Sequence, residues 1–160
     1  KKNLYFEAQK FKINDDRIVF LKKTIFEDHL SRHSIADLFL DTFNYNAHTT
    51  AVDALWTGLP IITKPGNSFS SRVCGSLLKF FDLDELILKN KDEYYNKALE
   101  LAENPHKLKA IKNKIVKHRD SNKYFDPKNY TLNLEKAYKK IHSMRVNENK
   151  FENIHIKDIE

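Results

Sequence analysis

The sequence predicts an α/β fold, a parallel sheet with flanking helices. Three short segments, residues 17–21, 36–41 and 59–63, have the apolar composition of strands. Segments with helical spacing of apolar residues separate them, and this order implies crossover connections between parallel strands. Beyond residue 84 the apolar spacing is helical throughout. The chain has 160 residues, 41% of them hydrophobic, which is enough for one core.

The first elements follow from local spacing and from polar breaks. Leu4, Ala8 and Phe11 have helical spacing, and the polar residues 14–16 end this first helix. Residues 17–21 then form a short strand. A brief helix is expected over residues 27–34. The next strand, residues 36–41, is apolar enough to be buried on both faces.

The middle of the chain is predicted to form a helix, a third strand and another helix. The first of these helices begins at His48 or Thr49 and runs to Trp56, and Gly58 terminates it. Residues 59–63 form the third strand, which a Pro65-Gly66 turn closes. The next helix covers residues 70–78.

The second half is predicted to be helical, with a start signal at each helix. Asn90 and Glu93 have the spacing of a capping pair. Pro105 opens a second helix and Asp126 precedes a third, as proline and aspartate do at helix starts. The third helix has one apolar face, made by Tyr130, Leu134, Ala137 and Ile141. We expect residues 1–144 to form one domain and residues 145–160 a polar tail.

The amino-acid composition limits the cellular environment and the classes of partner that are expected. The sequence has no membrane-spanning apolar run and no secretory signal pattern, and its one cysteine, Cys74, excludes an internal disulfide; we expect a cytoplasmic protein. The net charge is +6, with much of the excess in residues 107–119. Apolar residues there keep helical spacing, so these lysines form a solvated helix face, and a nucleic-acid partner is not expected. The chain starts without methionine, which indicates a fragment, a processed piece or a trimmed form of a longer protein.

The loop after residue 41 is the strongest candidate for a ligand site. Ligands of open parallel sheets bind at the carboxyl ends of strands, against helix amino termini. Thr49 and Thr50 lie where free backbone N–H groups face an anion, and His48 adds a donor. Asp53 lies one turn deeper on the same helix face, at a spacing that suits a diphosphate and a ribose diol. On spacing alone, a simple helix cap with a surface acid is the simpler interpretation.

The loop after residue 21 leads to a second candidate. His29 and Arg32 are three residues apart on a short helix. An imidazole face can stack on a base, and a guanidinium can donate to its carbonyl oxygens. Taken alone, this pair is equally explained as a solvated helix end.

A longer motif surrounds the first of these sites. Residues 40–60 read LDTFNYNAHTTAVDALWTGLP, and residues 61–73 continue IITKPGNSFSSRV. This run resembles the O-linked N-acetylglucosamine transferase family, with weaker similarity from about residue 17 to residue 142. The resemblance identifies the C-terminal part of that family's catalytic region, which has two Rossmann-like domains facing a cleft. It therefore implies that this chain is part of the second, nucleotide-sugar-binding domain.

The resemblance also implies a reaction. Family enzymes transfer a sugar, here expected to be N-acetylglucosamine, from a uridine-diphosphate donor to Ser or Thr of a protein acceptor. They do so with inversion and need no metal or other cofactor. Carried over by position, the diphosphate would contact His48, Thr49 and Thr50. Asp53 would hold the ribose.

The same resemblance places His29 and Arg32 at the uracil, and it assigns no catalytic residue within this chain. Several family features have no counterpart here. Ala47 stands where the family has glycine, Asn67 where it has an acid, and Phe26 where a lysine is common. The family's diphosphate-binding lysine, its first catalytic domain and its helical repeats would lie upstream of Lys1. We therefore expect a donor-binding part that is inactive by itself. The alternative is a non-catalytic module that keeps the fold and binds a protein or nucleic-acid partner.

Three further signals have simple structural interpretations. Asp82 and Asp84 form an acid-x-acid pattern, but their position after a helix predicts a turn rather than a metal site. Cys74 lies among small residues in a helix and is expected to be packed. Trp56 is expected to lie in the core.

Overall fold

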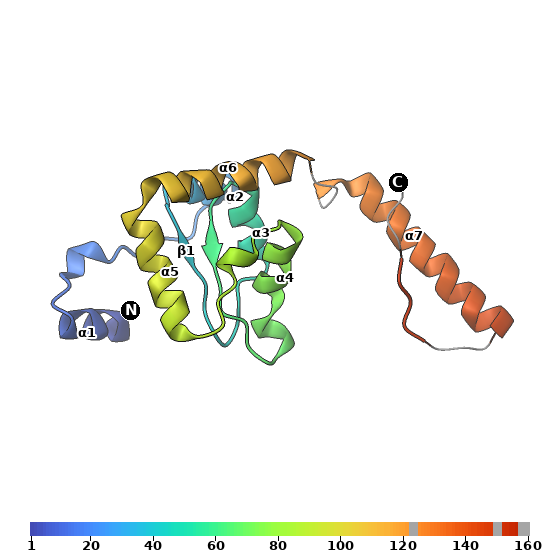
Figure 1. Cartoon of the computed structure of the whole chain (residues 1–160), viewed down its shortest axis with the longest axis horizontal. Coiled ribbons are helices and arrows are strands. Elements are labelled where there is room, and N and C mark those ends of the chain that lie inside the picture. The colour runs from blue at the N-terminus through green and yellow to red at the C-terminus, as the bar shows by residue number, and fades with distance from the viewer. Residues whose placement is uncertain (122–124, 149–151, 157–160) are drawn as a thin grey trace.

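A computed structural model of the chain describes residues 1–121, 125–148 and 152–156. Its centre is a parallel pair of short strands, β1 (Phe39–Leu40) and β2 (Ile61–Ile62), with Phe39 opposite Ile61 and Leu40 opposite Ile62. A parallel bridge from Thr63 to Ile87 adds a further segment beside β2. Helices pack around this sheet (Figure 1). The predicted α/β fold with a parallel sheet is confirmed, although the sheet is small.

A crossover helix, α3 (Thr49–Trp56), connects the two strands. It ends as predicted, because Gly58 has a φ of 83° and lies in the left-handed region that favours glycine. The N–H of Leu59 donates to the carbonyl of Ala54 at 2.8 Å, and the N–H of Gly58 donates to that of Leu55 at 3.1 Å. These two bonds satisfy carbonyls that the end of the helix would otherwise leave open.

One hydrophobic core joins the crossover unit to the helices that follow it. These are α4 (Val73–Phe80), α5 (Lys91–Glu103) and α6 (Pro105–Ser121). Along α6, Leu108, Ile111 and Ile115 face the core, which confirms the interpretation of its lysines as a solvated face. The largest fully buried aliphatic and aromatic residues are Leu55, Ile61, Ile62, Leu78, Phe81, Leu83, Leu86, Leu101 and Ile115.

Helix α5 begins with the capping pair that the sequence predicted. The side-chain oxygen of Asn90 accepts from the backbone N–H of Glu93 at 2.8 Å. The Glu93 carboxylate in turn accepts from the backbone N–H of Lys89 at 3.0 Å. Such a reciprocal pair satisfies N–H groups that have no partner inside the helix.

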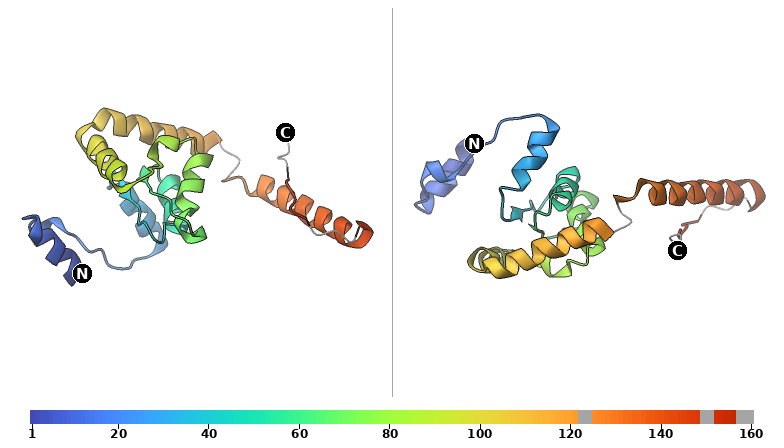
Figure 2. Two further views of the ribbon diagram at one scale, coloured as in Figure 1. Left: turned by 60° about the horizontal axis from the view of Figure 1, so that its bottom comes forward. Right: turned by 90° about the horizontal axis from the view of Figure 1, so that it is seen from above.

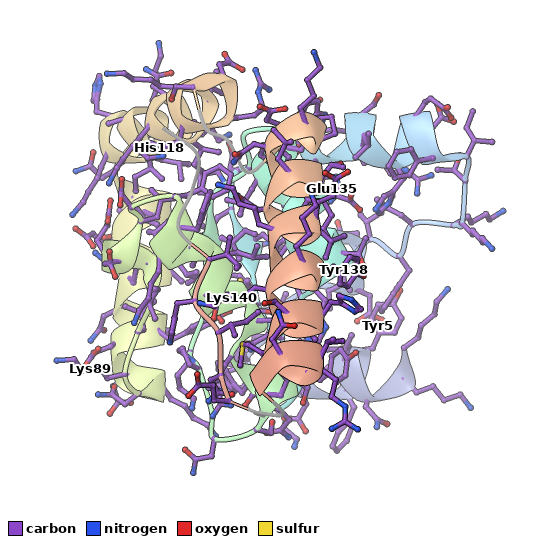
Figure 3. The ribbon with its side chains drawn as sticks, turned by 90° about the vertical axis from the view of Figure 1, so that its right-hand side faces the viewer. Tyr5, Lys89, His118, Glu135, Tyr138 and Lys140 are labelled. Carbon is purple, nitrogen blue, oxygen red and sulfur yellow. The ribbon has the colours of Figure 1, made fainter. Side chains whose placement is uncertain are left out.

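The two ends of the chain lie outside this core. α1 (Lys2–Lys10) and a short 3₁₀ turn (Asp15–Arg17) precede α2 (Phe26–His33) on one side. On the other side, α7 (Pro127–Ser143) projects away from the core, and none of its residues is buried (Figures 1 and 2). Figure 3 shows this helix in front of the core, with Glu135, Tyr138 and Lys140 on it.

The predicted polar tail begins in a π-helical turn, Met144–Glu148. Residues 152–156 have no regular secondary structure, and residues 149–151 and 157–160 of this tail lie outside the described residues. The division into residues 1–144 and 145–160 stays a prediction. No helix within the described ranges is long and apolar enough to cross a membrane.

Two strand predictions need correction. Residues 18–21 are not in a strand, and Val19 and Leu21 are 75% and 65% exposed. Of residues 36–41, only Phe39 and Leu40 pair, and Leu40 is 54% exposed rather than buried. An apolar strand is buried only where other elements cover both of its edges and both of its faces. In the described residues β1 has one strand neighbour, β2, and therefore stays partly exposed.

Two smaller predictions also differ from the structure. The helix expected over residues 70–78 begins as a 3₁₀ turn, Phe69–Ser71, and continues as α4. Trp56 is 46% exposed and lies outside the core, with the Arg119 guanidinium 5.6 Å from its ring centre. Its ring meets the edge of Phe125 at 5.0 Å on one side, and the long basic side chain of Arg119 covers part of the rest. Cys74 is fully buried, as expected.

Candidate functional site

Asp41 fixes the loop that leads to the candidate site. Its side chain is buried, and one carboxylate oxygen accepts from the backbone N–H groups of Thr42 at 2.8 Å and Ala47 at 2.7 Å. The other oxygen accepts from the hydroxyl of Thr63 at 2.6 Å. The Asp41 carbonyl accepts from the Tyr94 hydroxyl at 2.9 Å. One acid therefore ties the loop after β1 to the residue after β2 and to α5.

The loop delivers the chain to the amino terminus of α3. His48 is the N-cap residue, and its side chain makes no capping hydrogen bond. Its carbonyl accepts from Ala51 and Val52, but the backbone N–H groups of Thr49 and Thr50 have no acceptor among the described residues. Both threonines are exposed. Two free N–H groups, two hydroxyls and the positive end of the helix thus face solvent, which is the arrangement that binds an anion.

The imidazole of His48 is held on three sides. Its Nε2 lies 3.2 Å from the carbonyl of Ser70. Its ring stacks on Tyr45, with ring centres 4.7 Å apart and planes at 16°, and meets the edge of Phe69 at 6.1 Å. A carbonyl can only accept, so Nε2 carries the proton and Nδ1 is the nitrogen left for a ligand.

Helix α2 brings the second predicted pair to α3. The Nε2 of His29 lies 3.8 Å from an Asp53 carboxylate oxygen, and the Asp53 side chain is only 13% exposed. Residues from two separate predicted sites are therefore in contact. The structure places a base-stacking candidate beside the ribose-binding candidate, as a nucleoside would require.

Arg32 and His29 line one wall of a cavity of about 700 Å³ beside α2. The Arg32 guanidinium donates to the carbonyl of Lys22 at 2.7 Å, so the segment before α2 fixes this side chain in place. Leu21 and Phe26 add apolar surface to the cavity. Its walls combine apolar surface with fixed donors, the combination typical of small-molecule sites.

His33, one turn after His29, is part of the same cluster. The two imidazoles meet edge to face, with ring centres 4.9 Å apart. Burial lowers the pKa of His33, and His29 lowers it further, while Asp53 acts in the opposite direction. The Nδ1 of His33 is buried and has no hydrogen-bond partner among the described residues. A neutral His33 limits the positive charge around Asp53.

A second cavity, of about 420 Å³, lies directly at the start of α3. His48, Thr49 and Thr50 line it together with Asp41 and Tyr45. The predicted anion-binding residues therefore share one cavity. Within the described parts of the chain, no group of three or more His, Cys, Asp or Glu side chains could hold a metal ion. Asp82 lies in a turn with a φ of 53°, as its position predicted.

Three residues of this site were not predicted from the sequence. Asp41 organises the loop, Tyr45 stacks on His48, and Asn46 is 1% exposed and donates to the Thr42 carbonyl at 2.7 Å. An acid that directly follows a strand and precedes threonine is a signal for a local side-chain turn and could have indicated Asp41. Tyr45 and Asn46 carry no comparable local signal.

Comparison with known proteins bears on this geometry. The sequence matches glycosyl transferase family 41 over residues 1–134. The chain belongs to this family. Its relatives include a probable UDP-N-acetylglucosamine–peptide N-acetylglucosaminyltransferase, SEC, of Arabidopsis thaliana, 36% identical over 130 residues. The UDP-N-acetylglucosamine–peptide N-acetylglucosaminyltransferase of Caenorhabditis elegans is 37% identical over 123 residues. The resemblance to the O-linked N-acetylglucosamine transferase family is confirmed.

A solved structure of the same family confirms the fold. A variant of the Thermobaculum terrenum O-GlcNAc transferase matches 88% of this family 41 chain with a TM-score of 0.80 and 28% sequence identity. The chain corresponds to 27% of that solved chain. The match to the Arabidopsis relative includes 81% of this chain but 13% of that relative. The match to the nematode relative includes 77% of this chain but 11% of that relative. The chain therefore spans a small part of the transferases that it resembles.

Proposed function

We propose that this family 41 chain is the donor-binding part of an inverting glycosyltransferase. The complete enzyme would transfer N-acetylglucosamine from a uridine-diphosphate donor to Ser or Thr of a protein acceptor. The proposal rests mainly on one observation, the contact between helices α2 and α3. The free N–H groups at the start of α3 lie on the same helix as Asp53, whose carboxylate contacts His29 of α2.

Each residue has a distinct proposed role in holding the donor. The diphosphate accepts hydrogen bonds from the N–H groups and hydroxyls of Thr49 and Thr50, and the positive end of α3 attracts its charge. As an imidazolium, His48 donates to the diphosphate from Nδ1, since its Nε2–H is engaged by the carbonyl of Ser70. These interactions need no metal ion in the proposed scheme.

Asp53 accepts from the ribose hydroxyls in the proposed complex. His29, beside it, stacks on the uracil, and Arg32 donates to a uracil carbonyl from the same cavity wall. Burial of Asp53 strengthens a hydrogen bond to a diol, because little water competes for the carboxylate. This would make the site selective for a ribonucleotide over a plain diphosphate.

We further propose that the chain alone does not transfer sugar. It spans 13% of the Arabidopsis relative and 27% of the solved bacterial chain, and no residue in it is assigned a role as catalytic base. The first catalytic domain and any helical repeats would come from other parts of a full-length enzyme. Incubation of the purified chain with labelled UDP-N-acetylglucosamine and an acceptor peptide should give no labelled peptide.

Uridine diphosphate binding tests the proposal. We expect the chain to bind uridine diphosphate more tightly than uridine or inorganic phosphate, as measured by calorimetry and by NMR shifts of residues 48–53. Asp53→Ala should weaken binding of uridine diphosphate and leave pyrophosphate nearly unaffected. Asp120→Ala, which removes an exposed acid of α6, is the matched control.

Substitution of the two threonines should weaken uridine diphosphate binding less than Asp53→Ala does. Thr49→Val with Thr50→Val removes two hydroxyls but keeps the backbone donors, and each hydroxyl bond is worth about 0.5–1.5 kcal/mol, several-fold in affinity. The proposal is wrong if millimolar uridine diphosphate shifts no resonance in residues 48–53. Nucleic-acid binding that falls steeply with salt and ignores Asp53 would instead support the non-catalytic module.

A further inference from the structure

A third cavity is lined by basic side chains that the proposed donor site does not use. It has a volume of about 630 Å³ and lies beside the cavity at the start of α3. No acid lines it. Its lining includes two lysines, Lys64 and Lys91, two aromatic rings, Phe43 and Tyr45, and the polar side chains of Thr42 and Asn67. We call it the basic cavity.

Phe43 organises the two lysines of the basic cavity. The Nζ of Lys64 lies 5.6 Å from the centre of the Phe43 ring, and the Nζ of Lys91 lies 5.7 Å from it. The ring is fixed from behind by Tyr94, edge to face at 5.0 Å, and the Tyr94 hydroxyl bonds to Asp41. Both ammonium groups are thus held around one fixed ring by cation–π attraction.

The positive charge of the basic cavity has no local compensation. Neither Lys64 nor Lys91 has an acid partner within 4.0 Å among the described residues. Asn67, where the family resemblance leads one to expect an acid, is neutral. Its carbonyl is already engaged, because the Arg72 guanidinium donates to it at 2.8 Å. Two unpaired cations in one cavity favour an anionic ligand.

The basic cavity adjoins the proposed diphosphate site. Thr42 and Tyr45 line both the basic cavity and the cavity at the start of α3. The Tyr45 ring, 63% exposed, also stacks on His48. A ligand in the basic cavity would therefore lie next to the proposed diphosphate site.

We propose that the basic cavity is an acceptor subsite, which binds an acidic side chain of the protein substrate close to the Ser or Thr that is modified. This inference rests on the proposed function. In the proposed donor complex the free N–H groups of α3 hold the diphosphate and the sugar is neutral, which leaves the acceptor as the source of a second anion. Lys64 and Lys91 attract the carboxylate, and Phe43 and Tyr45 cover the carbon chain that carries it.

A pair of matched peptides tests the subsite. One peptide has a serine flanked by glutamates, and the other has glutamines in the same places. NMR titration of the ¹⁵N-labelled chain should show tighter binding of the glutamate peptide, with shifts at Phe43, Lys64 and Lys91. The preference should diminish with added salt.

Lysine substitutions locate the interaction. Lys64→Met with Lys91→Met should weaken binding of the glutamate peptide by roughly threefold for each lysine, the size of an exposed ion pair. Uridine diphosphate binding should not change. The control is Lys109→Met with Lys117→Met, which removes two exposed lysines of α6 and should leave the peptide affinity unchanged.

The outcomes separate this inference from the donor site. Equal binding of the two peptides, or a double methionine variant that still prefers glutamate, overturns the subsite. A variant that loses uridine diphosphate instead of the peptide assigns the lysines to the donor and also overturns it. If the wild-type chain binds the glutamate peptide but no uridine diphosphate, the proposed donor site fails while the anion subsite stands.

Discussion

Replacement of Asp41 by alanine is the most informative perturbation of this site. The carboxylate accepts hydrogen bonds from the N–H groups of Thr42 and Ala47 and from the hydroxyl of Thr63, and the side chain is 4% exposed. Alanine leaves these three donors without that acceptor. A donor left unsatisfied in the interior costs about 1–3 kcal/mol.

We expect Asp41→Ala to lower the free energy of unfolding by about 3–5 kcal/mol, less than a simple sum of three bonds, because the Thr63 hydroxyl can rotate and water can enter. Asp41→Asn keeps one oxygen for the two N–H groups, and the Thr63 hydroxyl can reverse to accept from the new amide. That variant should lose about 1–2 kcal/mol and remain folded.

Urea denaturation followed by circular dichroism measures both losses. The matched control is Asp37→Ala, near the same strand, whose carboxylate is 83% exposed and pairs with Lys112 at 3.2 Å. An exposed pair of this kind contributes about 0–1 kcal/mol. If Asp41→Ala costs no more than Asp37→Ala, Asp41 does not hold the loop in place. Because the loop positions His48, the folded Asp41→Asn variant should also bind uridine diphosphate more weakly.

Two further predictions concern the elements around the site. Gly58→Ala should lower the free energy of unfolding by about 1–2 kcal/mol, because φ is 83° and the added Cβ would lie 3.1 Å from Val116; an unchanged melting temperature would contradict this. Tyr94→Phe should lose about 1 kcal/mol with the hydrogen bond to Asp41. Burial raises the pKa of Tyr94 from 10.0 to about 12, so the folded protein holds this proton at a pH where the unfolded chain releases it. The wild type should therefore lose stability as pH rises from 10 to about 12, and a Tyr94→Phe variant with the same alkaline loss would refute the assignment.

The sequence by itself determined most of the helices. The start of α3 at Thr49, its end at Gly58 and the capping pair at Asn90 all depend on bonds between residues a few positions apart. The spacing of residues along the chain is therefore enough to predict where these helices begin and end. For the same reason the free N–H groups at the start of α3 could be predicted before the structure was known, along with the lysine face of α6.

Tertiary structure alone decided the extent of the sheet. A parallel strand forms only against a partner that a crossover separates from it in the chain, and composition does not show which partner is present. Residues 17–21 have strand composition, but no strand in the described part of the chain pairs with them, and residues 36–41 pair at only two positions. Trp56 is apolar by type, yet its exposure depends on Arg119, sixty-three residues later.

The construction of the site was likewise decided by contacts between distant residues. Asp41 bonds to Thr63, 22 residues away, and to Tyr94, 53 residues away, and no local pattern encodes either contact. The two ligand loops were predicted separately, and the packing of α2 against α3 brought His29 to Asp53. The sequence thus determined which groups can bind a nucleotide, because their chemistry is local. The fold determined which of them meet, because burial and long-range hydrogen bonds set distances that spacing along the chain does not.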